Sequence, residues 1–146
     1  MHQFYFKCTD CILCSAGGSS QNKVKVKYWV AGRSNVKEAD LTVLFGNLLE
    51  NAIDACDEVQ ENKRYINLKI YKPNSDSIVF YIENGFNGSI KKKNQQFLTT
   101  KANGNGIGIE SVKYVVHKYN GDVNIKTDEN KFIVSGVLLQ PLDATK

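Results

Sequence analysis

Three polar residues recur at helical spacing in the stretch NLLENAIDA. Asn47, Asn51 and Asp54 are separated by four and then three residues, so a helix places them on one narrow face, with Glu50 beside them. Their carboxamide and carboxylate oxygens suit Mg²⁺, which prefers oxygen ligands and keeps several of its waters. The alternative is an ordinary solvated face, but such a face more naturally carries Lys, Glu or Gln than two asparagines. We therefore interpret the stripe as a candidate magnesium site.

Three alternating glycines, Gly104, Gly106 and Gly108, lead into an apolar repeat in the stretch NGNGIGIESVKYVV. Glycine is a poor helix former, so its place at the start of a helix needs a reason. The first helical turn has unbonded N–H groups and a positive dipole end, and glycines let an anion approach the backbone closely. The stretch is therefore a candidate phosphate site. A flexible loop that runs into a helix is the simpler alternative.

A cysteine cluster near the start of the chain is the third candidate. Cys8, Cys11 and Cys14, with His2, could supply four zinc ligands. Structural zinc sites usually join two separated ligand pairs, and the sequence has no second pair downstream. We therefore expect free thiols, as for the isolated Cys56, with zinc as the alternative.

The composition predicts one domain that stays in the cytoplasm. The chain has 146 residues, 42% of them hydrophobic, with a mean hydropathy of −0.35 and a net charge of +4. No apolar run is long enough to span a membrane, and the N-terminus lacks the pattern of a signal peptide. The Gly/Ser-rich stretch 15–23 predicts a boundary, with 1–22 as a leader or linker, disordered or a remnant, and 23–146 as the domain. The positive charge, including Lys91–Lys93, is usual for a solvated surface, and here it would also suit an anionic ligand.

The elements that must position these residues follow from the hydrophobic periodicity. The pattern predicts a strand over 23–30, a helix over 40–59 capped by Asp40, a hairpin over 65–84, a long irregular loop over 86–104, a glycine-led helix that ends at 120–121, and a hairpin over 122–139. This order predicts an α/β (α+β) two-layer sandwich, with a mixed, mainly antiparallel sheet and both helices on one face. The first helix should pack on the sheet through Leu41, Phe45, Leu48, Leu49, Ala52, Ile53 and Cys56.

Three stretches of the chain resemble the boxes of the GHKL ATPases, a group that includes gyrase, Hsp-type chaperones, histidine kinases and the MutL repair proteins. NLLENAIDA is similar to their N box, YIENGFNG occupies the place of the first glycine box, and FLTTKANGNGIGI resembles the second. The resemblance covers Lys23 to Leu139, and it is strongest to the catalytic domains of quorum-sensing-type sensor histidine kinases. One box alone is weak evidence, but three in the right order on the expected elements are specific.

The resemblance implies a role for each matching residue. Asn51 corresponds to the asparagine that holds the magnesium bridging the ATP phosphates, and Asn47 to a polar position beside the same metal. The loop from Phe86 to Asn103 corresponds to the ATP lid, and Lys101 is placed to meet a phosphate. Beyond positioning of ATP and Mg²⁺, no catalytic residue is implied. The full nucleotide-binding set is Asn47, Glu50, Asn51, Asp54, Asn84, Gly88, Thr99, Thr100, Lys101, Gly104, Asn105, Gly106, Ile107 and Gly108.

The first glycine box departs from the pattern of the family, which reads Asp-x-Gly-x-Gly. Asn84 takes the place of the aspartate that accepts a hydrogen bond from adenine, Phe86 replaces the first glycine, and Gly88 matches the second. A rival alignment puts Glu83 at the aspartate position and Gly85 at the first glycine. We prefer Asn84, because the similar kinases also read Glu-Asn here, and its carbonyl oxygen still accepts a hydrogen bond.

The resemblance implies the ATP-binding catalytic domain of a two-component sensor histidine kinase. Such a domain transfers the γ-phosphoryl group of Mg-ATP to a histidine on a separate dimerisation and phosphoacceptor domain, which then serves a response regulator. The chain has only His2 and His117, so we expect no autokinase activity from it alone. We also expect an isolated monomer without nucleic-acid or membrane contacts, although a membrane anchor elsewhere in the parent protein is compatible with this.

Two alternatives remain open. Another GHKL protein, such as an anti-sigma type serine kinase, would carry the same boxes. A clamp ATPase is disfavoured, because Asn47 stands where those enzymes place the glutamate that activates water. The second alternative is a small module that binds zinc through the cysteine cluster or nucleic acid through its lysines.

Overall fold

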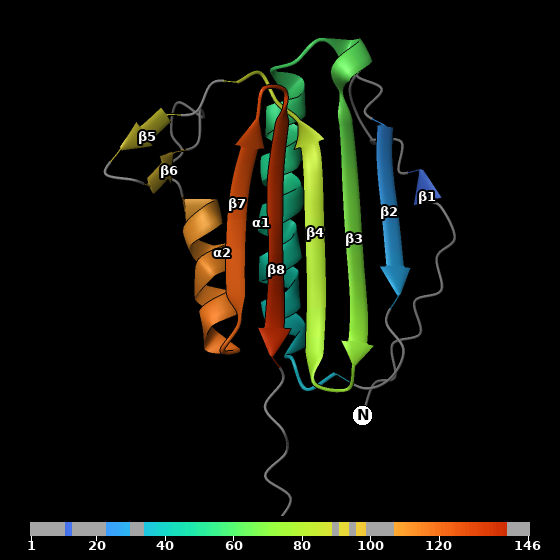
Figure 1. Ribbon diagram of the computed structural model, residues 1–146, viewed down its shortest axis with the longest axis vertical. Helices are drawn as coiled ribbons and strands as arrows, with labels where there is room; N and C mark the ends of the chain where they lie inside the picture. Colours follow the sequence, from blue (N-terminus) through green and yellow to red (C-terminus); the bar gives the residue numbers. More distant parts are fainter. Residues whose placement is uncertain are drawn as a thin grey trace, which may run out of the picture.

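One mixed sheet and two long helices form most of the described structure (Figure 1). The computed structural model describes residues 11–12, 23–29, 34–88, 91–93, 96–98 and 107–139. The six-stranded sheet has the order β1-β2-β3-β4-β8-β7, in which β2 pairs with β3 in parallel and the other neighbours are antiparallel. The elements are β1 (Cys11–Ile12), β2 (Lys23–Trp29), α1 (Glu38–Asp57), η1 (Glu61–Lys63), β3 (Tyr65–Asn74), β4 (Ser77–Gly85), β5 (Lys91–Lys93), β6 (Gln96–Leu98), α2 (Ile107–Lys118), β7 (Asp122–Asp128) and β8 (Lys131–Leu139).

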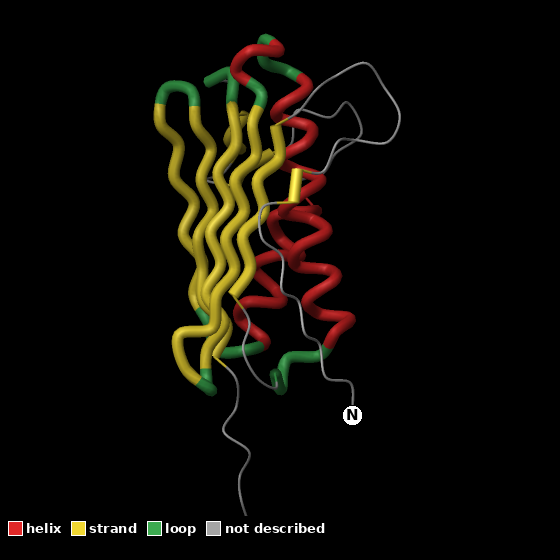
Figure 2. Tube along the Cα trace, turned by 90° about the vertical axis from the view of Figure 1, so that its right-hand side faces the viewer, coloured by secondary structure: helices red, strands yellow, loops and turns green. Residues whose placement is uncertain are grey.

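Both helices lie on the same face of the sheet, which confirms the predicted two-layer sandwich (Figure 2). The alternation of apolar residues along β3 and β4 explains the arrangement, because every second side chain of a strand points to the same face. The core lies between the layers, and its largest fully buried side chains are Phe80, Leu44, Leu48, Ile66, Leu68, Ile78, Ile82, Leu138, Val112, Val115, Val116 and Val134.

The N-terminus of α1 differs from the prediction. The helix begins at Glu38, its N-cap position is Lys37, and the side chain of Lys37 forms no capping hydrogen bond. Asp40 is therefore a residue of the first turn, and its carboxylate contacts the end of α2 instead. The prediction that Asp40 caps the helix was wrong, because a tertiary partner that is distant in the sequence competes for the carboxylate.

The buried stripe of α1 differs from the predicted one at two positions. Leu44, Leu48, Ala52 and Cys56 are fully buried at steps of four residues, as expected for a ridge that packs along a sheet. Ile53, which we expected in the core, follows this ridge by one residue and is 44% exposed. The single residue of offset turns Ile53 about 100° away from Ala52 around the helix axis, and Leu44 fills the core instead.

The end of α2 confirms the predicted helix stop and shows its chemistry. Asn120 adopts a positive φ of 50°, and the N–H group of Gly121 donates to the carbonyl of Val116 over 2.9 Å. The N–H group of Asn120 donates to the carbonyl of His117 over 3.0 Å. These two bonds form a Schellman motif, in which the left-handed residue reverses the chain.

Two segments contain strands that the sequence pattern does not predict. The expected long loop over 86–104 includes β5 and β6, which pair antiparallel as a separate two-stranded sheet. Three-residue strands are too short to show a periodicity. In the expected leader over 1–22, Cys11 and Ile12 form the edge strand β1 beside β2, whereas His2, Cys8 and Cys14 lie outside the described residues, so the zinc alternative stays a hypothesis. Cys56 is a free, buried thiol.

The face of the sheet that lacks helices carries a carboxylate held between two tyrosines. The hydroxyl groups of Tyr65 and Tyr81 both donate to Glu83, over 2.8 and 2.5 Å. Lys131 lies 3.9 Å from the same carboxylate. The bond from Tyr81, followed by that from Tyr65, holds the pKa of Glu83 below its ordinary value. Burial, and then the bond to Glu83, raises the pKa of Tyr81 to about 12, so its hydroxyl remains a donor at neutral pH.

The stability that Glu83 contributes should depend on pH. A carboxyl group whose pKa is lowered by folding stabilises the protein above its ordinary pKa, and the contribution is lost as the pH falls through the lowered value. We expect Glu83→Gln to lower the Tm at pH 7, and the difference from wild type to shrink as the pH falls below about 4.5. Glu110→Gln, at an exposed carboxylate that pairs with Lys113, is the control and should change the Tm little. A difference that stays constant down to pH 3 would show that the charge of Glu83 is not its cause.

Candidate functional site

The first turn of α2 lies directly against the polar stripe of α1. A Cβ atom added to Gly108 would lie 3.1 Å from Oδ1 and 3.2 Å from Nδ2 of Asn51, and 3.4 Å from Oδ1 of Asn47. Such distances are tighter than ordinary van der Waals contact, so a glycine lets the start of α2 approach both carboxamides. The structure therefore brings together the two candidates that the sequence presents far apart, the possible metal ligands and the possible phosphate cradle.

Asn51 carries an unsatisfied polar atom at this contact. Among the described residues, its Nδ2 is the buried side-chain nitrogen or oxygen that has no hydrogen-bond partner. Native proteins rarely leave such a group unpaired, because its desolvation costs about 1–3 kcal/mol. Its neighbour Asn47 donates from Nδ2 to the carbonyl of Val43 over 2.7 Å, so its amide nitrogen is already used within α1 and its oxygen is left as the group that faces Gly108.

These carboxamides fit the magnesium and phosphate chemistry that the sequence predicts. Asn51 and Asn47 supply oxygen atoms of the kind that Mg²⁺ prefers, and the orphaned N–H group of Asn51 can donate to an anionic oxygen. The start of α2 adds a positive helix dipole at the same place. Glu50 is exposed and Asp54 is half-buried on the same helix, and each already has an interaction partner in the structure.

The end of β4 places Asn84 and Glu83 on opposite faces of the sheet. Asn84 continues the buried alternation of β4 on the side of the helices and is 2% exposed, with Nδ2 donating to the carbonyl of Gly85 over 2.8 Å. Glu83 lies on the face without helices, among tyrosines. Asn84 and Glu83 are the two residues proposed to contact adenine. Of these, Asn84 is therefore the one on the helix side of the sheet, where Asn51 lies. A Cβ atom at Gly85 would lie 2.3 Å from the carbonyl oxygen of Lys63, so this close approach requires glycine.

Phe86 stands where the family has the first glycine of this box, and its packing explains the difference. Phe86 is 9% exposed, its ring centroid lies 5.9 Å from that of Phe132, and its N–H group donates to the carbonyl of Asn130 over 3.0 Å. A side chain at this position therefore joins the end of β4 to the β7–β8 hairpin. Gly88 has a φ of 81°, a conformation that favours glycine.

The segment that follows β4 makes one contact that the sequence does not predict. Nδ2 of Asn87 donates to Oε2 of Glu58 over 3.0 Å, which ties the segment after β4 to the end of α1. The two residues are far apart in the sequence, and no local pattern signals such a pair.

Part of the predicted site lies outside the described residues. α2 begins at Ile107, and its backbone is described from there, whereas the predicted positions Thr99, Thr100, Lys101, Gly104, Asn105 and Gly106 are not among the described residues. Their roles stay predictions.

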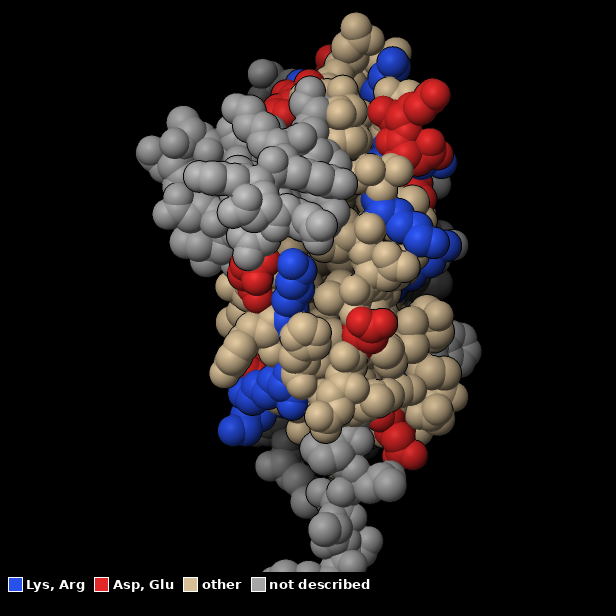
Figure 3. Space-filling view, turned by 60° about the vertical axis from the view of Figure 1, so that its left-hand side comes forward, with Lys and Arg blue, Asp and Glu red and all other residues tan. Residues whose placement is uncertain are grey.

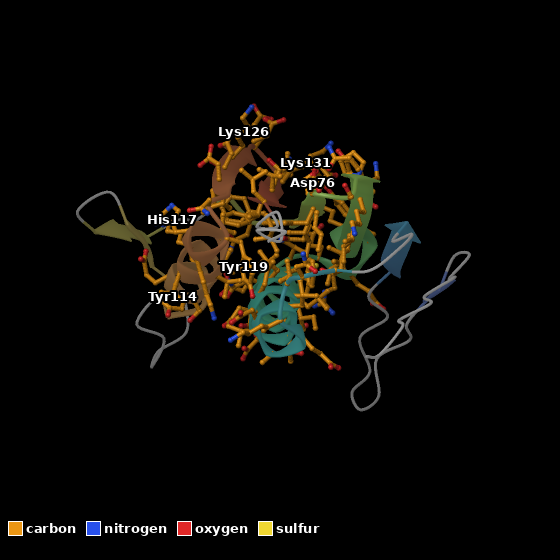
Figure 4. The ribbon with its side chains drawn as sticks, turned by 90° about the horizontal axis from the view of Figure 1, so that it is seen from below. Asp76, Tyr114, His117, Tyr119, Lys126 and Lys131 are labelled. Atoms are coloured by element: carbon orange, nitrogen blue, oxygen red, sulfur yellow. The ribbon has the colours of Figure 1, made fainter. Side chains whose placement is uncertain are left out.

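On the face that Figure 3 shows, basic and acidic side chains of the described residues are interspersed. None of the helices in the described ranges is long and apolar enough to cross a membrane. In Figure 4, Tyr119 points from α2 toward α1, whereas Tyr114 and His117 lie on the side of α2 away from α1.

Comparison with known proteins agrees with this architecture. A probable C4-dicarboxylate sensor kinase from Halalkalibacterium halodurans is 25% identical over 95 residues, which are 62% of this chain and 18% of that protein. The chain therefore spans less than a fifth of the length of this relative.

Three solved structures share the fold at low sequence identity. The mycobacterial sensor histidine kinase MprB superposes with a TM-score of 0.56 and 16% identity, over 80% of this chain and 82% of that one. The catalytic domain of histidine kinase ThkA gives 0.56 and 16% over 80% and 79%, and Acinetobacter baumannii histidine kinase AdeS gives 0.57 and 15% over 82% and 54%. The GHKL domain profile matches residues 36–140, nearly all of the described sandwich. The chain belongs to the GHKL domain family.

Proposed function

We propose that the chain is the ATP-binding catalytic domain of a sensor histidine kinase, which transfers the γ-phosphoryl group of ATP to a histidine on a separate acceptor domain. Membership of the GHKL family implies ATP binding. The main support for a Mg-ATP site between α1 and α2 is the close approach of Gly108 to the Asn51 and Asn47 carboxamides. At this point a buried donor of Asn51 lacks a partner. The names of the relatives support a histidine rather than a serine acceptor.

The residues of this chain would bind and orient the nucleotide rather than react with it. Asn51 and Asn47 would hold Mg²⁺, which when bound neutralises charge on the phosphates. The N–H groups at the start of α2 would donate to phosphate oxygens, with the dipole of α2 favouring their negative charge. Asn84 would accept a hydrogen bond from the adenine base of the nucleotide. Phosphoryl transfer depends mainly on positioning and charge stabilisation, so a site built from amides and glycines suffices.

We also propose two partners for phosphoryl transfer, an acceptor domain and a response regulator. An acceptor domain must supply the histidine, because His117 is exposed on α2 and lies nine residues beyond Gly108, roughly 13 Å along the helix from the phosphate end. A response regulator would then take the phosphoryl group from that acceptor. The acceptor domain would belong to the parent kinase, and the response regulator would be a separate partner.

A labelling experiment tests this proposal. We expect the chain, incubated with γ-labelled ATP and Mg²⁺, to acquire no acid-labile, base-stable phosphate, because no histidine of the described structure reaches the site. Adding a dimerisation and phosphoacceptor domain from a matching kinase should produce label on the histidine of that domain. His117→Ala is the control and should leave this transfer unchanged.

Two results would contradict the proposal. Label on the chain alone, abolished by His2→Ala, would show that the acceptor lies within this chain. Label on a serine of a supplied partner would favour the anti-sigma type serine kinase instead.

A further inference from the structure

The start of α1 and the end of α2 are joined by a group of polar contacts, which we call the clasp and which comprises Lys37, Asp40, Lys118 and Tyr119. The hydroxyl group of Tyr119 donates to Oδ2 of Asp40 over 2.5 Å and accepts from the N–H group of Lys37 over 2.9 Å. Nζ of Lys118 lies 2.8 Å from Oδ2 and 3.1 Å from Oδ1 of the same carboxylate. The clasp thus satisfies an N–H group at the start of α1 with the side chain of Tyr119, the residue that follows α2.

Two members of the clasp, Tyr119 and Asp40, are shielded from solvent, whereas the side chain of Lys118 is 38% exposed. Tyr119 is 6% exposed, and the side chain of Asp40 is 14% exposed. The hydrogen bonds from Lys118 and then from Tyr119 hold the pKa of Asp40 below its ordinary value. The backbone carbonyl of Tyr119 also accepts from the N–H group of Leu139 over 3.0 Å, so the end of α2 is fixed to the sheet and to α1.

The clasp and the candidate site lie at matching distances along the two helices. Asp40 precedes Asn51 by the same number of residues as Gly108 precedes Tyr119. Because Asp40 meets Tyr119 and Asn51 meets Gly108, the helices run antiparallel, and both intervals span about 16 Å. Fixing one pair therefore sets the longitudinal position of the other.

We propose that Asp40 and Tyr119 are positioning residues for the nucleotide site, which lock α2 along α1 so that its first turn meets Asn51. The inference rests on the proposed function, since it concerns binding at that site. Between the two ends, α1 and α2 share one apolar core, which includes Leu44 and Leu48 of α1 and Val112 of α2. Apolar contacts are not directional. The bonds of the clasp are directional, and a slip by one residue would displace α2 by about 1.5 Å.

The contact at Gly108 shows how close the backbone of α2 comes to the two carboxamides of α1. A Cβ atom added to Gly108 would lie 3.1–3.4 Å from Asn51 and Asn47, so the first turn of α2 lies next to these side chains, and a displacement of α2 by about 1.5 Å moves its N–H groups relative to them. An oriented site is sensitive to errors of this size, because donors must lie within hydrogen-bond distance of a ligand at the right angle.

The test compares Tyr119, which directly follows α2, with Tyr114 in the last turns of α2. Tyr119→Phe removes the hydroxyl group of the clasp and keeps the ring, whereas Tyr114→Phe does the same at a side chain that is 69% exposed. Mg-ADP is titrated calorimetrically at a temperature well below both melting points, so that every molecule is folded. We expect Tyr119→Phe to raise the Kd for Mg-ADP about three- to tenfold, and Tyr114→Phe to leave it unchanged.

A second variant keeps the test decisive if Tyr119→Phe does not fold. Asp40→Asn removes the charge of the clasp, and it should raise the Kd by a similar factor. The double variant should be no weaker than the single ones, because both changes break one unit. A lower Tm with an unchanged Kd in the folded variants would show that the clasp is merely structural and would overturn the inference. A wild-type chain that does not bind Mg-ADP would refute the proposed function instead.

Discussion

Replacing Asn51 with alanine is expected to weaken binding of the magnesium complex of ATP or ADP by one to two orders of magnitude, while binding of the metal-free nucleotide changes far less. The carboxamide is the group that we assign to the metal, and a hydrogen bond or ligand contact to a charged group contributes about 1.5–3 kcal/mol. Calorimetric titration of wild type and variant, with Mg²⁺ and with a chelator, measures the difference directly.

The same substitution should not destabilise the free protein. Nδ2 of Asn51 is buried without a partner, so alanine removes an unsatisfied donor, and it is also the better helix former. We expect the Tm of the nucleotide-free variant to equal or exceed that of wild type. Asn124→Ala, at an exposed position of β7, is the control for nucleotide binding. An equal loss with and without Mg²⁺ would refute the metal role of Asn51.

Gly121→Ala is expected to be the most destabilising of the glycine substitutions. A Cβ atom at this position would lie 1.9 Å from the carbonyl oxygen of Val137 and 3.1 Å from that of Val116. Both are backbone atoms, which cannot rotate away as a side chain can. We expect a loss of about 3 kcal/mol or more in the free energy of unfolding, which lowers the Tm by roughly 10 °C in a domain of this size.

Gly46→Ala is the matched control for this result. Gly46 lies within α1, and no atom outside its own helix lies within 4 Å of an added Cβ, so alanine should stabilise the helix by about 0.5–1 kcal/mol. Thermal unfolding followed by circular dichroism measures both variants. The explanation from the Val137 contact fails if Gly121→Ala unfolds at the same temperature as wild type.

The parts of the fold that follow from local periodicity could be predicted from the sequence. The alternation in β3 and β4 predicts both the hairpin and its buried face, and the Asn120-Gly121 pair predicts the stop of α2. The order of the strands in the sheet is harder to predict from the sequence, because β4 pairs with β8 and not with the strand that follows it in the chain.

The parts that depend on distant partners could not be predicted. Asp40 has the residue type and the position of a helix cap, yet its partners are Lys118 and Tyr119, which no local pattern reveals. Ile53 is apolar and close to the predicted stripe, but the geometry of packing on the sheet leaves it exposed. For the site, spacing alone grouped Asn47 with Asn51, whereas their approach to Gly108 was expected only from the family resemblance.

The central position of β8 bears on how the chain reaches its folded state during synthesis. Ser77 pairs with Leu139 and Gly85 with Lys131, so the ladder between β4 and β8 joins residues that leave the ribosome far apart in time. Until Leu139 has emerged, β4 is an open edge, and the side of Phe80 that meets Gly136 is uncovered. The β3–β4 hairpin can form early, at little cost in loop closure, whereas the β7–β8 hairpin needs β8 itself. We therefore expect the nascent chain to gain its full cooperative stability only once the last strand is available.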